Sequence, residues 1–438
     1  MERVAAQLLG LLAGVILVKL GNPVIFSDQL QAPGNFFEWC FMSWPPGWSF
    51  WMLALAMLVS LPLWRWKTNV PAWLLGLPLL WLGWQWVAAR WSVDARLTAK
   101  VLPHFAACVG AFYVGVFAMG RLRRDTLFWA GLLAAFAWVL YEGWDQHFGG
   151  LAATRRHFET MDWSQAPPGL RVAWESAGFR YKIMSDRIFS TFVYPNALAG
   201  AILLLLPPLL AWLAVVWRKQ MAALLLLFLA LPCLYWSGSK AGWLIALVLG
   251  LVWVLHLSLG RRARLLIVGA VLLVGVTAFF LRFSTYFAKG ATSAGARFEY
   301  WQAAWGNFKA HPVVGSGPGT FGAVYRKVKS PGAEMARLTH NDYLEQASDS
   351  GGIGGLAYAA FWLVGLVWGY RNCAAQPMRL AIWLGLLGWS LQGFVEFGLY
   401  IPALACPAFL LFGLLAGQEE EKQVLPLSLI KGRIPLPG

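Results

Sequence analysis

The chain has 438 residues, of which 59% are hydrophobic and 13% are charged. A soluble domain carries about 25% charged residues, so the composition excludes an ordinary soluble protein and indicates a polytopic membrane protein. The net charge of +15 would suggest nucleic acid in a soluble chain, but lysine and arginine collect in the cytoplasmic loops of membrane proteins, and we expect no nucleic-acid partner.

Apolar runs long enough to cross about 30 Å of hydrocarbon recur along almost the whole sequence. They predict an all-α fold with about twelve transmembrane helices. These are expected near residues 4–20, 48–64, 71–89, 101–119, 126–141, 190–217, 221–237, 241–259, 264–282, 353–370, 378–396 and 400–417.

The polar stretches between the spans divide the chain into expected units. These are N-terminal spans with an outer loop (1–189), central spans (190–282), a large helical outer loop (283–352), C-terminal spans (353–417) and a tail (418–438). The long outer loops are rich in aromatic residues, which favour a membrane–water interface or line a groove for sugar or lipid. They include Trp144, Trp163, Trp174, Tyr181, Tyr286, Tyr300, Trp301 and Trp305.

Short basic loops set the expected orientation. Every second loop carries arginine or lysine: Arg65 and Lys67, then Arg121, Arg123 and Arg124, then Arg218 and Lys219, then Arg261, Arg262 and Arg264, and last Arg371 and Arg379. The positive-inside rule places these loops and both termini in the cytoplasm. The alternate loops, including residues 142–189 and 283–352, then face outward.

The second long outer loop ends in T-H-N-D-Y-L, which contains His340. The spacing of Thr339 and Asp342 is that of a capping box, so we expect Thr339 to cap a helix with His340 in its first turn. The helix dipole favours a neutral imidazole there, and a neutral histidine can act as a general base. A surface histidine without a chemical role is the alternative.

Arg297 is expected to open a second short helix in the same loop. Phe298, Trp301, Trp305 and Phe308 follow at helical spacing as one apolar stripe, which we expect along the membrane surface or against the bundle. A cation near a helix N-terminus is unfavourable by itself, so its position suggests a bound anion. A solvated surface arginine is the alternative.

Two more cations are expected on the outer face with Arg297 and His340. Arg187 precedes the sixth span, and Lys240 lies in the tight turn S-G-S-K-A-G. The positive-inside rule disfavours cations on the outer face. A cluster of them there suggests that they bind an anion such as pyrophosphate, which arginine contacts in bidentate fashion. An ion pair with Asp186 and simple anchoring at the interface are the alternatives.

Signals for other chemistry are weak. No pair of histidines has metal-ligand spacing and there is no D-x-D motif, so we predict no metal and no cofactor. The segment 315–319 (G-S-G-P-G) lacks a preceding strand and predicts a loop, not a phosphate-binding turn. Ionisable residues inside the expected spans are few, chiefly Lys19, His104, His256 and Glu396, which disfavours a transport path.

Several stretches resemble one bacterial family. R-I-F-S-T-F-V-Y-P-N-A-L-A resembles the Arg…Phe…Pro-Asn segment of O-antigen ligases, and S-G-S-K-A-G resembles their Ser-x-Ser-Arg turn. The stretches R-F-E-Y-W-Q-A-A-W, H-P-V-V-G-S-G-P-G-T-F and T-H-N-D-Y-L-E-Q-A-S-D-S-G-G resemble the shared core of the O-antigen ligase and polymerase superfamily, and V-E-F-G-L-Y-I-P-A-L-A resembles its closing span. The resemblance covers about residues 185–417.

The resemblance implies a metal-independent membrane glycosyltransferase of the GT-C type in the bacterial inner membrane, with its active site at the periplasmic face. The donor would be a glycan on undecaprenyl pyrophosphate, and the acceptor a sugar of lipid A–core, both among membrane lipids. His340 matches the catalytic base, and Arg187 and Arg297 match arginines that hold the pyrophosphate. Lys240 stands where many members have arginine, so a point charge replaces a bidentate contact.

Four further residues are expected to position donor or acceptor: Asn341, Asp342, Tyr300 and Asn196. An O-antigen or exopolysaccharide polymerase and a protein O-oligosaccharyltransferase are alternatives within the superfamily. The short tail favours the ligase. A transporter of lipid-linked glycan is the alternative from another class.

Overall fold

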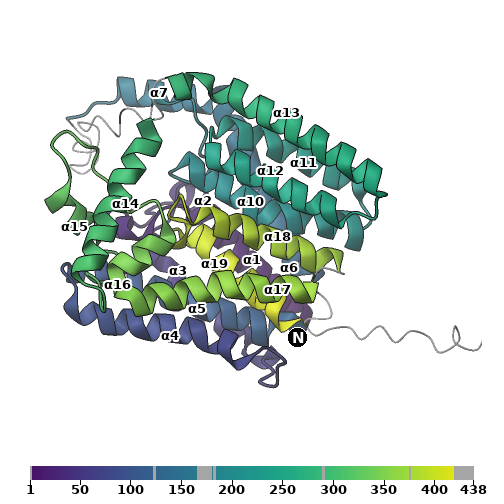
Figure 1. Ribbon diagram of the computed structural model, residues 1–438, viewed down its shortest axis with the longest axis horizontal. Coiled ribbons are helices and arrows are strands. Elements are labelled where there is room, and N and C mark those ends of the chain that lie inside the picture. The colour runs from purple at the N-terminus through teal and green to yellow at the C-terminus, as the bar shows by residue number, and fades with distance from the viewer. Residues whose placement is uncertain are drawn as a thin grey trace, which may run out of the picture.

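The computed structural model describes residues 2–121, 125–164, 180, 184–288, 292–373 and 376–418. Helices make up nearly all the secondary structure of these ranges, and the ranges hold no strand (Figure 1). The predicted all-α fold is therefore confirmed. The predictions for Arg123, Arg124, Trp174, Tyr181 and the tail from residue 419 lie outside the described residues.

The long helices follow the apolar runs of the sequence. The first half of the chain forms α1 (Glu2–Lys19), α3 (Ser49–Ser60), α4 (Ala72–Ala88), α5 (Ala95–Phe117) and α6 (Thr126–Asp145). The second half forms α10 (Pro195–Ala211), α11 (Gln220–Trp236), α12 (Lys240–His256), α13 (Arg261–Ala288), α16 (Asp342–Ala359), α17 (Gly365–Cys373), α18 (Pro377–Gln392) and α19 (Pro402–Gly417). Each expected span overlaps one of them.

Seven helical stretches of the described chain are long and apolar enough to cross a membrane, and α11, α12 and α19 are shorter apolar helices. This agrees with a polytopic membrane protein, as predicted. The number of twelve spans stays a prediction.

Two predicted boundaries lie beside breaks in the helices. The span expected at 353–370 begins just after Gly351, whose φ of +68° and ψ of −171° interrupt α16 and separate the span from the turns at residues 342–350. The span expected to end near residue 396 stops at Gln392, and residues 393–401 form a turn before α19. The Gly393 carbonyl in this turn accepts the Asp342 N–H at 2.7 Å, so the start of α16 and the end of α18 lie side by side.

Close backbone contacts hold the centre of the bundle together. Helices α5 and α19 pack so tightly that a Cβ at Gly413 would lie 2.0 Å from the Phe112 carbonyl oxygen. Small residues at helix crossings are typical of membrane bundles, where packing rather than water exclusion drives association. Figure 1 shows α19 in the interior, α4 along one edge and α13 along the opposite edge.

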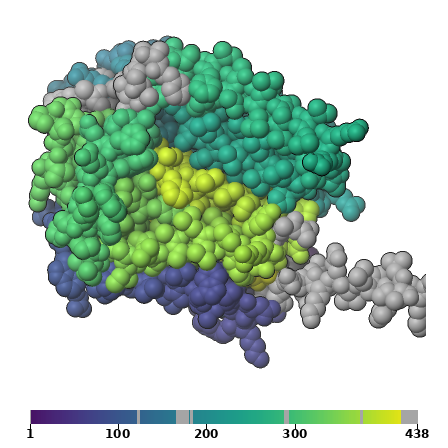
Figure 2. All heavy atoms as spheres, in the orientation of Figure 1, coloured from purple at the N-terminus to yellow at the C-terminus, as the bar shows by residue number. Residues whose placement is uncertain are grey.

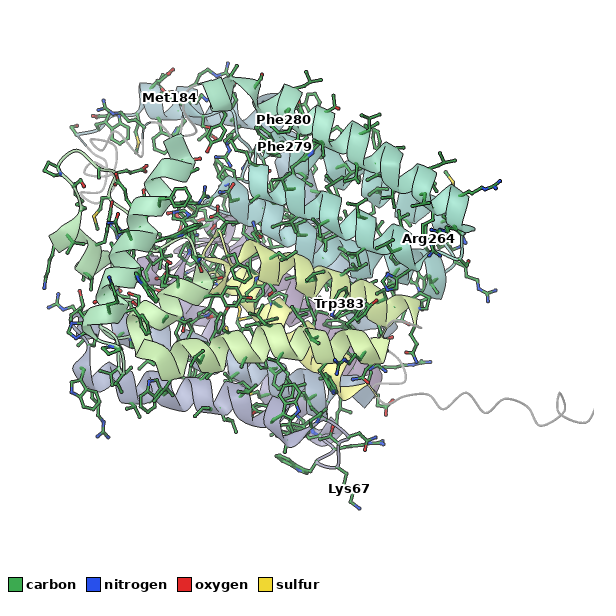
Figure 3. The ribbon with its side chains drawn as sticks, in the orientation of Figure 1. Lys67, Met184, Arg264, Phe279, Phe280 and Trp383 are labelled. Carbon is green, nitrogen blue, oxygen red and sulfur yellow. The ribbon has the colours of Figure 1, made fainter. Side chains whose placement is uncertain are left out.

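Smaller helices gather at one end of the bundle. They are α2 (Phe36–Phe41), α7 (Leu151–Thr160), α14 (Thr292–Ala310) and α15 (Phe321–Val328), and α14 packs against α16. In Figure 3, Met184 marks this end, and Arg264 lies at the opposite end of α13. The helical character predicted for the loop 283–352 is therefore present, in the helices that carry Arg297 and lead to His340.

Candidate active site

A carboxylate in the turn between α18 and α19 connects the residues that the sequence singled out. Glu396 is 6% exposed. Its Oε2 lies 3.1 Å from Nδ1 of His340, and its Oε1 accepts hydrogen bonds from the Arg297 guanidinium and the Asn196 amide. Three residues from distant parts of the chain therefore meet at one side chain.

Arg187 joins this group through Asn196. Its Nη2 donates to Asn196 Oδ1 and its Nε donates to the Ser237 carbonyl, each at 2.7 Å. Asp186, the alternative partner expected for Arg187, forms an ion pair with Arg155 of α7 at 2.7 Å. The Arg187 guanidinium thus lies between the turn before α12 and the amide that contacts Glu396.

The turn that Arg187 touches depends on a glycine. Gly238 has a φ of +61°, in the left-handed region that glycine adopts without steric cost. A Cβ at this position would also lie 3.1 Å from the Arg187 Nε. Gly238 therefore allows both the tight turn and the close approach of the guanidinium.

Lys240 is the first residue of α12, capped by the side chain of Ser239. Its ammonium lies 3.9 Å from the ring centroid of Tyr286 and 5.2 Å from that of Phe283, both on α13. These cation–π contacts hold the charge at the edge of the cluster, within electrostatic range of Arg187 and other arginines.

The prediction that His340 lies in the first turn of a helix is wrong. Asn341 is the N-cap of α16, because its side chain accepts the Leu344 N–H at 2.9 Å and the helix begins at Asp342. His340 precedes the cap with a φ of +54°, a conformation uncommon for non-glycine residues and frequent at functional sites. Thr339 does not cap the helix; its hydroxyl contacts the Glu345 carboxylate at 2.8 Å.

The carboxylate partner decides which nitrogen of His340 carries a proton. Burial would raise the pKa of Glu396, but the nearby His340, Arg297 and Arg187 outweigh it and hold the pKa below its usual value. An ionised carboxylate only accepts hydrogen bonds, so Nδ1 of His340 is the donor. In the neutral ring Nε2 is then the acceptor, which is the arrangement that a general base requires.

The prediction that Arg297 opens its helix is wrong. In the described residues α14 begins at Thr292, so Arg297 lies in the second turn. Its Nε donates to the Val395 carbonyl at 3.1 Å, next to the contact with Glu396. These acceptors, and not a helix N-terminus, account for the position of the cation.

The face of α14 that carries Tyr300 and Ala304 packs on the protein. Phe298 and Trp305 are 64% and 50% exposed, which fits the alternative of a stripe along the membrane surface, whereas Trp301 of the same stripe packs on the protein. Tyr300 and Ala304 are buried, and the Tyr300 ring lies 5.9 Å from the His340 ring. The exposed aromatic side chains are therefore available to the membrane surface.

Three carboxylates of α16 fasten the loops around His340. Asp342, Glu345 and Asp349 are each 0% exposed. They accept the backbone N–H groups of Leu399, Thr339 and Gly319 at 3.1, 2.9 and 2.8 Å, respectively. The segment 315–319 is the loop that the sequence predicts, and Asp342 is a support of the turn that carries Glu396.

Positive charge exceeds negative charge in this group. Arg297 and Arg187 both lie near Glu396, and Lys240 lies within electrostatic range of these two arginines. A cavity of about 10 Å³ beside Asn196 and Glu396 has room for a water-sized group. Figure 2 shows the yellow residues around the turn in a hollow between α14 and the teal helices. The excess of cationic side chains around Glu396 attracts an anion.

Another group of ligand-type side chains lies in the core. The donor atoms of His104, Cys108 and Cys406 lie within 4.8 Å of one another. His104 Nε2 lies 2.7 Å from the Leu399 carbonyl, which can only accept, so this nitrogen carries a proton. That hydrogen bond accounts for Nε2, whereas Nδ1 of the same ring is buried without a hydrogen-bond partner among the described residues.

Glu396 is the site residue that the sequence predictions missed. It was recognised only as one of few ionisable residues in an expected span and as part of V-E-F-G-L-Y. A carboxylate in such surroundings is expensive to bury and is therefore a sign of function. That signal would have added Glu396 to the candidates.

Comparison with known proteins bears on the same region. No curated protein matches the chain. Residues 223–359 match the family model described as O-antigen ligase. The matched segment contains Lys240, Arg297 and His340, and the fold adds Arg187, Asn196 and Glu396 from outside it. The match covers less than half of the chain and shows that this segment is similar to the O-antigen ligase family.

Proposed function

We propose that the protein is an O-antigen ligase of the bacterial inner membrane. It transfers a glycan from undecaprenyl pyrophosphate to a sugar hydroxyl of lipid A–core at the periplasmic face. The observation that carries this proposal is the contact of Glu396 with both His340 and Arg297, which joins a base to an anion-binding cation.

His340 acts as the general base in this mechanism. Its Nε2 takes the proton from the acceptor hydroxyl while Nδ1–H remains bonded to Glu396. The acceptor oxygen then attacks the anomeric carbon, and the bond from that carbon to the pyrophosphate oxygen breaks. A single displacement inverts the anomeric centre. Glu396 keeps the ring in one tautomer and stabilises the imidazolium that forms.

Arg187, Arg297 and Lys240 receive the pyrophosphate. The guanidinium of Arg297 has more N–H donors than its contacts with Val395 and Glu396 use. Positive charge near the leaving oxygen stabilises the anion as it departs, so no general acid is required. Asn196 and Tyr300 lie beside the cations and the base, where they can orient donor and acceptor. Asn341 and Asp342 position the site indirectly. Asn341 caps α16, and Asp342 supports the turn that carries Glu396.

A transfer assay with two acceptors tests the proposal. The purified protein is incubated with undecaprenyl-pyrophosphate glycan and either lipid A–core or a second lipid-linked repeat. Glycosylated lipid A–core is the expected product. A lengthened lipid-linked glycan alone would overturn the ligase in favour of a polymerase.

The base is tested by His340→Ala, with His311→Ala as the matched control because His311 is exposed and follows α14. Loss of a general base typically costs about 10²- to 10⁴-fold in rate. We expect that loss in His340→Ala with donor binding kept, and full activity in His311→Ala. Normal transfer by His340→Ala would remove the imidazole from the mechanism.

A further inference from the structure

The segment that carries Arg187 has no regular secondary structure. Residues 185–189 lie outside the helices of the described chain, and α10 begins only at Pro195. Ile188 and Ser190 are nevertheless buried. Backbone N–H and C=O groups in such a segment need hydrogen-bond partners from other parts of the protein. The position of the Arg187 guanidinium therefore depends on the groups that bind this backbone.

Gln146, the residue that ends α6, supplies several of these partners with one side chain. Its Oε1 accepts the Phe189 N–H at 2.9 Å and the Ser190 N–H at 2.7 Å, and its Nε2 donates to the Ser190 carbonyl at 2.9 Å. A side-chain amide both accepts and donates, so Gln146 pairs with this backbone as a neighbouring strand would. The chain is thereby held two and three residues after Arg187.

The backbone conformation of Ser190 shows that the segment needs this support. Its φ is +55°, in the left-handed region that non-glycine residues seldom adopt. Such a conformation persists only where the surrounding structure holds it. The Ser190 hydroxyl also donates to the Val139 carbonyl at 2.5 Å, and Val139 belongs to α6. Helix α6 thus holds Ser190 through its last turns and through Gln146.

The other support of Arg187 is joined to the same end of α6. The Arg187 Nε donates to the Ser237 carbonyl, and Trp236 precedes Ser237. The His147 ring stacks on the Trp236 ring, with centroids 3.8 Å apart and an interplanar angle of 9°. The Trp236 carbonyl accepts the Ile188 N–H at 3.3 Å. The neighbours Gln146 and His147 therefore contact both chain segments between which the guanidinium lies.

We propose that Gln146 is a positioning residue for pyrophosphate binding and that it acts through Arg187, an inference that rests on the proposed function. The amide of Gln146 is bonded to backbone groups and not to the guanidinium. Its effect is to hold the Arg187 backbone in place before the anion arrives, so that less order has to be created on binding.

A double-mutant cycle with inorganic pyrophosphate as the probe tests this role. Gln146→Met keeps the length of the side chain and removes its hydrogen bonds. We expect it to weaken pyrophosphate binding to the detergent-solubilised full chain about tenfold, since a misplacement of about 1 Å can cost up to about 10²-fold. In an Arg187→Ala background the same change should alter the affinity by less than about twofold, because Gln146 then has no guanidinium to position.

Gln85→Met is the matched control. Gln85 lies on α4, and its buried Nε2 donates to Gln346 and Ser350 at 3.0 and 2.9 Å. This variant should lose thermal stability and bind pyrophosphate as the wild type does. An equal loss of pyrophosphate affinity in Gln85→Met would overturn the proposal, because general loosening of the fold would then explain the effect. An undiminished effect of Gln146→Met in the Arg187→Ala background would overturn it as well.

Gln146→Glu keeps the test decisive if Gln146→Met does not fold. A glutamate can accept both N–H groups and loses only the donor to the Ser190 carbonyl. The affinity it loses should be greater with Arg187 present than in the Arg187→Ala background, and equal losses would overturn the proposal.

The binding cycle is separate from the test of the proposed function because it requires no turnover. A wild type that binds pyrophosphate and shows the expected coupling, yet does not glycosylate lipid A–core, would reject the ligase and leave the role of Gln146 in place. A wild type that does not bind pyrophosphate would reject both.

Discussion

Replacement of Glu396 by glutamine is the sharpest single test of the site. The variant keeps the shape of the side chain and removes its charge. Oε1 and Oε2 of Glu396 serve three donors, on Arg297, Asn196 and His340. A glutamine has one acceptor oxygen and one amide that donates, so one of these donors must face another N–H group.

The expected effect follows from what Glu396 does for the imidazole. A hydrogen bond to a charged group contributes about 1.5–3 kcal/mol, and Glu396 also fixes the tautomer and stabilises the imidazolium. We take about 2–4 kcal/mol of lost transition-state stabilisation, which corresponds to a decrease of about 30- to 1,000-fold in kcat. The upper part of the range applies if the glutamine amide turns its NH₂ towards His340.

Transfer kinetics and donor binding must be measured together. Because Glu396→Gln removes a negative charge beside an anion site, donor affinity should stay equal or increase while kcat falls. Glu299→Gln is the control, since Glu299 is exposed on the same helix as Arg297. A kcat within about twofold of the wild type, or a parallel loss of donor binding and thermal stability, would refute the orienting role of Glu396.

Three further outcomes are expected. Arg297→Lys should weaken pyrophosphate binding about tenfold, because an ammonium lacks the bidentate donors of guanidinium; unchanged affinity in equilibrium binding would contradict it. Asn341→Ala removes the cap of α16 and should lower the free energy of unfolding by about 1 kcal/mol, measured by denaturant titration, and no change would argue against the capping contact. The pKa of Glu396 is lower in the folded protein than in the unfolded chain. Its contribution to stability is therefore fully present above the unfolded pKa of about 4.3, and it is lost as the pH falls through the folded pKa. The wild type should therefore lose stability more steeply than Glu396→Gln in this acid window, and parallel acid-unfolding curves would count against that assignment.

The helices were predictable because a bilayer requires long apolar runs, which any hydropathy pattern records. The errors lie where polar residues are buried against protein. Asp342, Glu345 and Asp349 belong to a short helix that the sequence places in an outer loop, yet each side chain is buried in the first turns of α16. Their hydrogen-bond partners come from other segments, so no local pattern could have identified them.

The gathering of His340, Arg297 and Arg187 was predicted from topology alone. Alternation of basic loops assigns each loop to one of two faces, and this is enough to put remote residues on the same face. The alternation of basic loops does not predict which side chains touch one another. Glu396 and Asn196 provide those contacts, and their part in the site depends on tertiary packing between α10 and the turn after α18.

The geometry of His340 shows why a local rule failed at the residue that matters most. A capping box would have placed the imidazole on α16, with its direction set by the helix. Asn341 takes the cap instead, and His340 adopts a left-handed φ of +54°, at a cost of about 1–3 kcal/mol. The bonds of Thr339 to Glu345 and of the Asp342 N–H to Gly393 hold the chain on both sides of His340. The same Gly393 turn carries Glu396, so the backbone that constrains the base also delivers the carboxylate that orients it.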